Sequence, residues 1–454
     1  MYVVVFIAVF GSSVVGATLF GISLNKMALL PLEVYLILEN GKNTKFCIHG
    51  RQKYLVWWYV ISCGGSLSGI IFSIIHNTQV TDELIRRAGF QVFSYIFLLG
   101  PIALMIWNSQ YQYKYIFCFK KAFIWTARIQ AMWGIMQFVL MQTIRFDLNG
   151  IVLEKMFEGT WTQYSNIANS SVGVVMRVTG INHDAAFLGL LLLIGFILES
   201  KPLYKTLYVV CALLALSRVA LVSIALVVFY QLVIIVKRNT LNYRKLKRLV
   251  KYGVISIIIF IIFFKIYTEA PAVQKQIIRV IERFSTISTG ADGTSRHSGY
   301  PIAMLQLELQ HIPLIQKLIG VGNQCGGILM SYYSKYLQWL GLSTSMLELD
   351  YVWSVESDIA SVFLETGIIG GFLYYIFLSK SFFSARTDER KKTLVIGIVI
   401  FGIMYNMAGG AFIQLVYISL LATNCSLNNN LDCYGAHEKN EFEKRQLYRV
   451  GQLL

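Results

Sequence analysis

The stretch ALLALSRVALVSIALV (residues 212–227) places Arg218 inside an apolar run that covers residues 204–236. Basic residues flank this run on both sides, so it crosses a membrane an even number of times if both flanks lie on one face. A helix of this length is only about 50 Å long, which is too short for two full spans of roughly 30 Å each. We therefore predict a short helix that enters the membrane, turns near Ser217 and Arg218 in its outer half, and returns.

The charge of Arg218 needs a polar environment at that depth. A break in a membrane helix is tolerated where it lines protein or a water-filled cavity. An arginine that faces lipid near the bilayer centre costs roughly 3 kcal/mol on insertion scales. We expect Arg218 to face a polar cavity that opens outward. The alternative is a side chain that reaches the outer headgroups and has only a structural role.

The composition indicates the same class of protein. The 454 residues are 56% hydrophobic and 14% charged, and the mean hydropathy is +0.58, which suits many membrane spans better than one soluble core. The first apolar stretch, 2–24, has neither a basic leading region nor a cleavage site, and we interpret it as a first span. The sequence therefore predicts an all-α polytopic membrane protein.

Apolar windows of about 20 residues give the spans. The chain makes twelve passes, with both termini on one side, if four short passes are also counted. These short passes are 27–38, 204–217 and the two halves of 393–423. The full-length windows are 3–24, 54–75, 89–107, 121–142, 183–199, 251–268 and 356–378, and residues 219–236 form the descending half of the opening run.

Of the 40 basic residues, 18 fall in four clusters that belong on the cytoplasmic face by the positive-inside rule. The net charge of +16 then reflects topology, and we expect no nucleic-acid partner. The clusters are Lys42, Lys45, Arg51 and Lys53; Lys114, Lys120 and Lys121; Lys237, Arg238, Arg244, Lys245, Lys247, Arg248 and Lys251; and Arg386, Arg390, Lys391 and Lys392.

This topology divides the chain into four parts. Residues 1–268 form an N-terminal bundle of about nine passes with an external loop at 143–183. Residues 269–355 form a large helical extracytoplasmic loop, 356–423 the last membrane helices and 424–454 a cytoplasmic tail. The uncharged turn in the middle of 393–423, around Asn406 to Gly410, indicates close packing or a turn lined by backbone.

The large loop contains two basic features. PAVQKQIIRVIERF (271–284) predicts an amphipathic helix in which Lys275, Arg279 and Arg283 recur every four residues, a stripe that suits anionic headgroups or a lipid-linked pyrophosphate. A simply solvated face is the alternative. TSRHSGYPIAML (294–305) places Arg296 and His297 just before a helix, where backbone N–H groups favour anions, although a lone histidine is more often a surface residue.

Arrangements typical of other enzymes are missing from the sequence. None of the six histidines forms an HExxH motif or a cluster with metal-ligand spacing. The sequence also lacks a Walker A lysine, a GxSxG elbow and a GxGxxG turn after a strand. We therefore expect neither a zinc protease nor an ATP-driven pump, and the sequence offers no metal or cofactor site.

Four segments carry a family resemblance. LSRVALVS (216–223), TSRHSGYPIAML, IPLIQKLIGVGNQ (312–324) and ESDIASVFLETGIIGGFLYYIF (356–377) resemble, in this order, motifs of the O-antigen polymerase and ligase superfamily. The resemblance covers about residues 185–378, and each motif alone is short. It implies a GT-C-type membrane glycosyltransferase that acts at the outer face of the bacterial inner membrane on glycans linked to undecaprenyl pyrophosphate.

The resemblance implies a role for each candidate site residue. The leaving pyrophosphate gains negative charge as the glycosidic bond breaks, and guanidinium groups can stabilise that charge. The acceptor hydroxyl must lose a proton to a base, for which Glu356 and Asp358 are the best placed, unless they only complement a helix dipole. The residues expected to bind substrate and pyrophosphate are Arg218, Arg279, Arg283, Arg296, His297 and Tyr300.

Two alternative functions stay open. In the resembling ligases a histidine lies nine residues before the glutamate of an E-x-G element; here that element is Glu365 and Gly367, and the residue nine earlier is Glu356, which favours a polymerase. A flippase for lipid-linked oligosaccharides would also bind pyrophosphate with membrane arginines, but the sequence shows no internal repeat. Expected partners are undecaprenyl-pyrophosphate-linked glycans, membrane lipids and a regulator of chain length.

Overall fold

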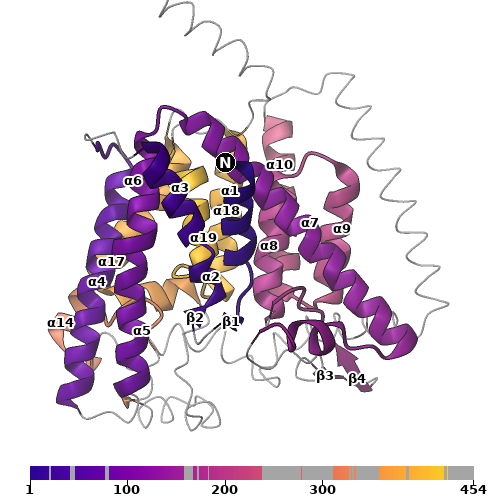
Figure 1. Ribbon diagram of the computed structural model, residues 1–454, viewed down its shortest axis with the longest axis horizontal. Coiled ribbons are helices and arrows are strands. Elements are labelled where there is room, and N and C mark those ends of the chain that lie inside the picture. Colours follow the sequence, from indigo (N-terminus) through magenta and orange to yellow (C-terminus); the bar gives the residue numbers. More distant parts are fainter. Residues whose placement is uncertain are drawn as a thin grey trace, which may run out of the picture.

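The computed structural model shows a mostly helical chain whose longer helices run beside one another (Figure 1). In the part that it describes, the strands form two short antiparallel hairpins. The described residues are 1–19, 22–40, 46–76, 81–157, 167–170, 173–182, 184–237, 278, 310–326, 329, 332–333, 357–384, 388–423 and 427.

The first apolar window, 3–24, is not one helix, and the prediction of a continuous span there is wrong. Helix α1 (Tyr2–Ser12) ends where the hydroxyls of Ser12 and Ser13 donate hydrogen bonds to carbonyls one turn earlier. Gly16 follows with a φ of 93°, a backbone conformation that few other residues adopt. The chain then continues through β1 (Thr18–Leu19), β2 (Ile22–Ser23), α2 (Leu24–Met27) and α3 (Leu30–Asn40).

Within the described residues, three helices are long and apolar enough to cross a membrane: α4 (Gln52–Ile75), the continuous helix Ala88–Asn108 and α17 (Asp358–Phe383). They match the predicted windows 54–75, 89–107 and 356–378. Other elements in this part of the chain are α5 (Thr81–Phe93), η1 (Ser94–Leu99), α6 (Gly100–Asn108), α7 (Gln112–Ile144), η2 (Asn149–Leu153), β3 (Ile167–Ser170) and β4 (Gly173–Met176).

The run quoted first is two helices, as predicted. Helix α9 (Pro202–Leu214) is separated from α10 (Arg218–Lys237) by a short turn. Leu216 in this turn has a φ of 51°, which ends α9 because a right-handed helix requires a negative φ at every residue. Both helices pack on α8 (Ala185–Leu198), so the three form one group of the bundle (Figure 1).

The predicted two halves of 393–423 are also separate helices. Helix α18 (Glu389–Met404) is followed by the turn Tyr405–Gly410, and then by α19 (Ala411–Val416) and η5 (Tyr417–Leu421). Helix α18 packs against both α10 and α17, so it joins the two sides of the bundle. The short helix α14 (Leu314–Ile319) comes from the predicted external loop, and it packs on α4 and α17.

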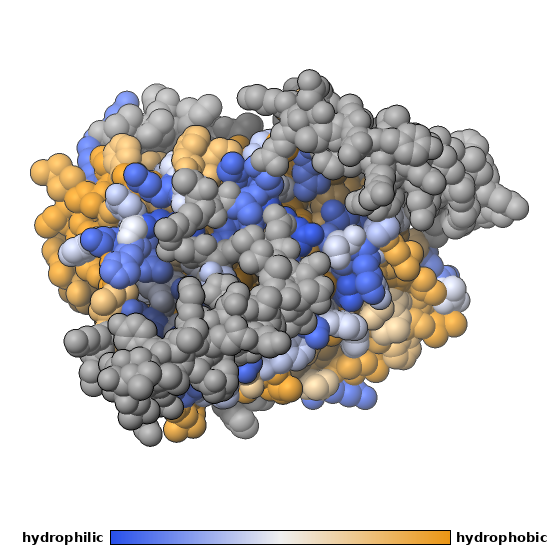
Figure 2. All heavy atoms as spheres, turned by 90° about the horizontal axis from the view of Figure 1, so that it is seen from above, coloured by the Kyte–Doolittle hydropathy of each residue, from blue (hydrophilic) through white to orange (hydrophobic). Residues whose placement is uncertain are grey.

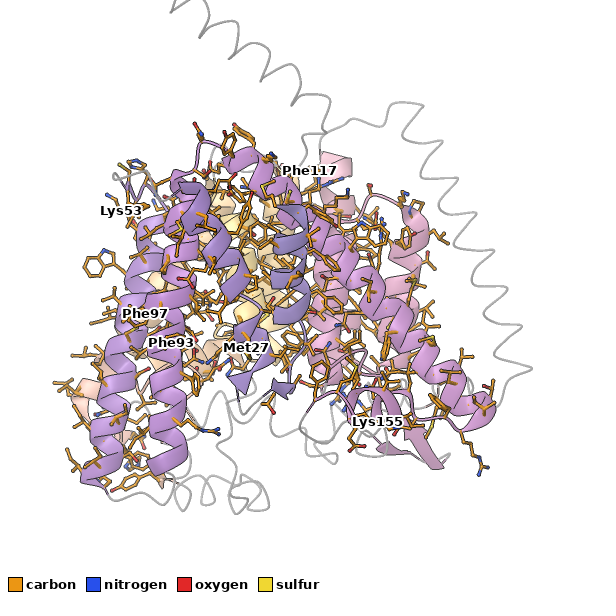
Figure 3. All side chains as sticks on the ribbon, viewed as in Figure 1. Met27, Lys53, Phe93, Phe97, Phe117 and Lys155 are labelled. Atoms are coloured by element: carbon orange, nitrogen blue, oxygen red, sulfur yellow. The ribbon has the colours of Figure 1, made fainter. Side chains whose placement is uncertain are left out.

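Basic residues from three of the four predicted clusters meet at one end of the molecule, which we call the basic end. The side chains of Arg51 and Lys391 donate to the carbonyl of Thr423, and Lys120 donates to the carbonyl of Leu427. Figure 3 shows Lys53 and Phe117 toward this end, where Figure 1 marks the N-terminus, and Lys155 of the loop 143–183 at the opposite, distal end. This arrangement agrees with the predicted grouping of the clusters on one face.

Hydrophilic and hydrophobic residues are distributed over the surface as in a protein that lies in a membrane. Figure 2 looks onto the basic end, where hydrophilic residues gather in the middle and hydrophobic ones follow the sides. Phe93 and Phe97, on the outer side of the bundle in Figure 3, are 45% and 57% exposed. Together with the three long apolar helices, these features support a polytopic membrane protein.

Candidate functional site

The distal end brings together the turns and helix termini that the sequence singled out. Asp184 caps α8 by accepting a hydrogen bond from the N–H of Ala186 at 2.9 Å, and its other oxygen accepts one from the Tyr405 hydroxyl at 2.5 Å. On the next turn of α8, Gly189 lies against Ser217: a Cβ added to Gly189 would lie 2.6 Å from Oγ of Ser217. The turn after α9 and the turn after α18 therefore lie at the same end of α8.

Arg218 is the first residue of α10 at this end, and its side chain is partly exposed. Arg177, which precedes α8, also reaches the turn: its Nε donates to the carbonyl of Ala215 at 3.5 Å. The neighbouring N–H of Val178 donates to the carbonyl of Leu214 at 3.3 Å. No motif in the sequence singles out Arg177, and the structure adds it to Arg218 as a second cation at the turn between α9 and α10.

Asp358, a predicted catalytic residue, begins α17 and is 3% exposed. Its Oδ1 accepts hydrogen bonds from the backbone N–H groups of Met407 at 2.7 Å and Ala408 at 2.9 Å. The carboxylate thus holds the turn Tyr405–Gly410, which confirms the interpretation of that turn as tightly packed backbone. This contact gives Asp358 a positioning role, and its role as a base stays a prediction.

Glu365 performs a similar task two turns farther along α17. Its carboxylate accepts hydrogen bonds from the N–H groups of Gln324 at 2.7 Å and Gly326 at 3.4 Å, and its backbone carbonyl accepts one from Gly322 at 2.8 Å. The residue is 1% exposed. We predicted no role for Glu365 beyond its place in the E-x-G element. An acidic residue inside an apolar window nevertheless indicates a buried contact.

The segment from Leu314 to Gly326 packs against α4 and α17, with residues 320–323 buried and Leu314 and Ile315 exposed. Gln316 donates to the hydroxyl of Ser68 in the middle of α4 at 3.1 Å, and Gly367 breaks α17 with a φ of 66° where α14 ends. We expected these residues in the external loop. We name residues 314–326 the re-entrant segment, because they return from the predicted external loop to pack on α4 and α17.

The two turns held by α17 also touch each other. An added Cβ on Gly409 would lie 2.6 Å from Oδ1 of Asn323, and the side chain of Asn323 donates to the hydroxyl of Tyr95. One carboxylate therefore fixes the re-entrant segment, the other fixes the turn Tyr405–Gly410, and both turns pack together at the distal end of the bundle.

The other six predicted site residues lie outside the described residues. Among those that the structure describes, it brings Arg218 and Asp358 to the same end of the bundle, and it places no group of three metal-ligating acids, histidines or cysteines together. The residues outside are Glu356, Arg279, Arg283, Arg296, His297 and Tyr300.

The hydrogen bond between Tyr405 and Asp184 ties α18 to the start of α8. Tyr405→Phe removes only the hydroxyl, so the free energy of unfolding should fall by about 1 kcal/mol, measured by chemical denaturation in detergent. Tyr375→Phe is the matched control, because the structure gives its hydroxyl no hydrogen bond within the described residues. An equal loss in both variants would contradict this assignment.

Neither a protein-family model nor a curated protein sequence matches this chain.

Proposed function

We propose that the chain polymerises undecaprenyl-pyrophosphate-linked repeat units into O-antigen or a similar surface polysaccharide. It works at the outer face of the bacterial inner membrane as a GT-C-type protein of about twelve spans, with both termini cytoplasmic. The observation that carries the proposal is the pair Arg177 and Arg218 at a helix break, at the end of the bundle opposite the basic end.

The pyrophosphate is the part of the substrate that this pair suits. Guanidinium groups bind phosphate oxygens with two parallel hydrogen bonds and keep their charge at any physiological pH. In the transfer, the bond between the anomeric carbon and the pyrophosphate oxygen breaks, and its electron pair leaves with undecaprenyl pyrophosphate. A hydroxyl at the nonreducing end of a new repeat unit forms the new bond, so neither metal nor nucleotide is required.

The acceptor hydroxyl loses its proton to a carboxylate. Of the two predicted bases, Asp358 already uses one oxygen to hold the turn Tyr405–Gly410. We therefore assign the base to Glu356, two residues before it, and a positioning role to Asp358. Arg279, Arg283, Arg296, His297 and Tyr300 of the loop complete the proposed binding surface for the lipid-linked substrate, and a chain-length regulator is the proposed protein partner.

The test uses purified protein in detergent with a lipid-linked repeat unit, EDTA and no nucleotide. The expected product is a ladder of glycan lengths on a gel, because each transfer adds one repeat unit. Heat-inactivated protein is the control. A folded wild-type protein that gives no ladder would contradict the polymerase, and adding a lipid-core acceptor to the same reaction separates a ligase from a polymerase.

A flippase is the second candidate, and one observation favours it. The described helices are interrupted at three places in the bundle, after α9, at Gly367 in α17 and after α18, and interrupted helices are typical of transporters. Transport of the same lipid across liposome membranes, without a ladder, would support the flippase.

A further inference from the structure

The first two turns of α17 carry a row of buried oxygen atoms without hydrogen-bond partners. These atoms are Oγ of Ser357, Oδ2 of Asp358 and Oγ of Ser361. The three residues are 1%, 3% and 0% exposed. Ser361 lies three residues after Asp358 on the same side of α17, and Ser357 is the N-cap residue directly before the helix. Buried polar atoms in this number normally have partners, and their grouping indicates a ligand.

The charge on this side of α17 is negative. Asp358 and Glu365 are both buried, and Ser361 lies between them at helical spacing. Among the described residues, the ion pairs are Arg128 with Glu199 and Lys392 with Glu389, and neither includes these carboxylates. Both carboxylate oxygens of Glu365 accept hydrogen bonds, whereas Oδ2 of Asp358 accepts none. A buried carboxylate in this state favours a positive ligand.

The facing wall is the last turn of α18. Gly402 lies so close that an added Cβ would be 2.7 Å from Oδ2 of Asp358. The last four carbonyls of a helix lack partners within the helix, and this end carries the negative end of its dipole. Ends of interrupted helices bind sodium in transporters through the same groups.

We propose that Ser357, Asp358 and Ser361 bind a sodium ion against the end of α18. The ion joins the start of α17 to the turn Tyr405–Gly410, whose N–H groups occupy the other oxygen of Asp358. It stabilises the fold and takes no part in glycan transfer. The proposal is independent of the proposed function, and its experiment measures stability, so failure of either leaves the other standing.

The test is the thermal unfolding of the full-length protein in detergent at constant pH and ionic strength, in sodium, potassium or choline chloride. Sodium should raise Tm by about 3 °C over choline, because a ligand that binds only the folded state stabilises it, and potassium should raise it less. In Ser361→Ala, the sodium concentration at half effect should rise at least about tenfold, since a ligand oxygen is lost.

Ser381→Ala is the matched control. Ser381 lies near the other end of α17, is 1% exposed and also has a hydroxyl without a partner. It should keep the wild-type response to sodium, and Ser357→Ala replaces Ser361→Ala if the latter does not fold. Equal Tm values in the three salts, or a sodium response that survives both serine substitutions, would overturn the proposal. A response to pH without one to sodium would assign the site to a proton and overturn it as well.

Discussion

Gly65→Ala should lower the free energy of unfolding by about 3 kcal/mol. An added Cβ on Gly65 would overlap the carbonyl of Ile319, lie 3.0 Å from the backbone nitrogen of Gly322 and lie 3.2 Å from the carbonyl of Glu365. All three are backbone atoms, so no side chain can rotate away, and overpacking of this kind costs about 1–3 kcal/mol or more. The re-entrant segment would have to leave α4.

Gly64→Ala is the control in the adjacent position of α4. An added Cβ on Gly64 has nothing within 4 Å, so alanine should be neutral or stabilise the helix by up to about 1 kcal/mol. Thermal unfolding in detergent compares the two variants. A Gly65→Ala protein as stable as Gly64→Ala would show that residues 314–326 do not pack on α4.

Arg218→Ala should reduce the rate of polymerisation at least about 100-fold. A fixed guanidinium that stabilises charge in a transition state is worth two to three orders of magnitude in rate. Arg218→Lys keeps the charge but loses the two parallel hydrogen bonds, so it should recover only part of the rate. The measurement is the initial rate of ladder formation with the purified protein.

Arg86→Ala controls for the loss of a positive charge. Arg86 is an exposed residue of α5, away from the α9 and α10 turn in sequence, and its removal should leave the rate unchanged. Thermal unfolding of each variant checks that the fold is intact. If Arg218→Ala is folded and makes the wild-type ladder, the arginine does not act on the pyrophosphate.

The break at Arg218 could be predicted because its cause is local. The length of the apolar run and its basic flanks require a turn, and the structure has one with Leu216 in the left-handed region. The basic end follows from the same kind of argument, since charge alone groups Arg51, Lys120 and Lys391. Helix length and charge position are properties of the sequence read one segment at a time.

The first window and the re-entrant segment could not be predicted in that way. The hydropathy of 3–24 hides the serines and glycine that end α1, because hydropathy averages over backbone conformation. The re-entrant segment depends on contacts such as that between Ser68 and Gln316, 248 residues apart in the chain. Its glycines and Glu365 have a clear role only when α4 and α17 are seen together.

The distance in sequence between Ser68 and Gln316 also fixes an order of assembly. When α4 leaves the ribosome and enters the lipid, the segment that covers Gly65 and Ser68 has not been synthesised. The surface of α4 that later binds residues 314–326 therefore stays exposed to lipid or to a helper protein while more than half of the chain is translated. The bundle closes only when the last third of the polypeptide arrives, so completion of this contact is a late event in biogenesis.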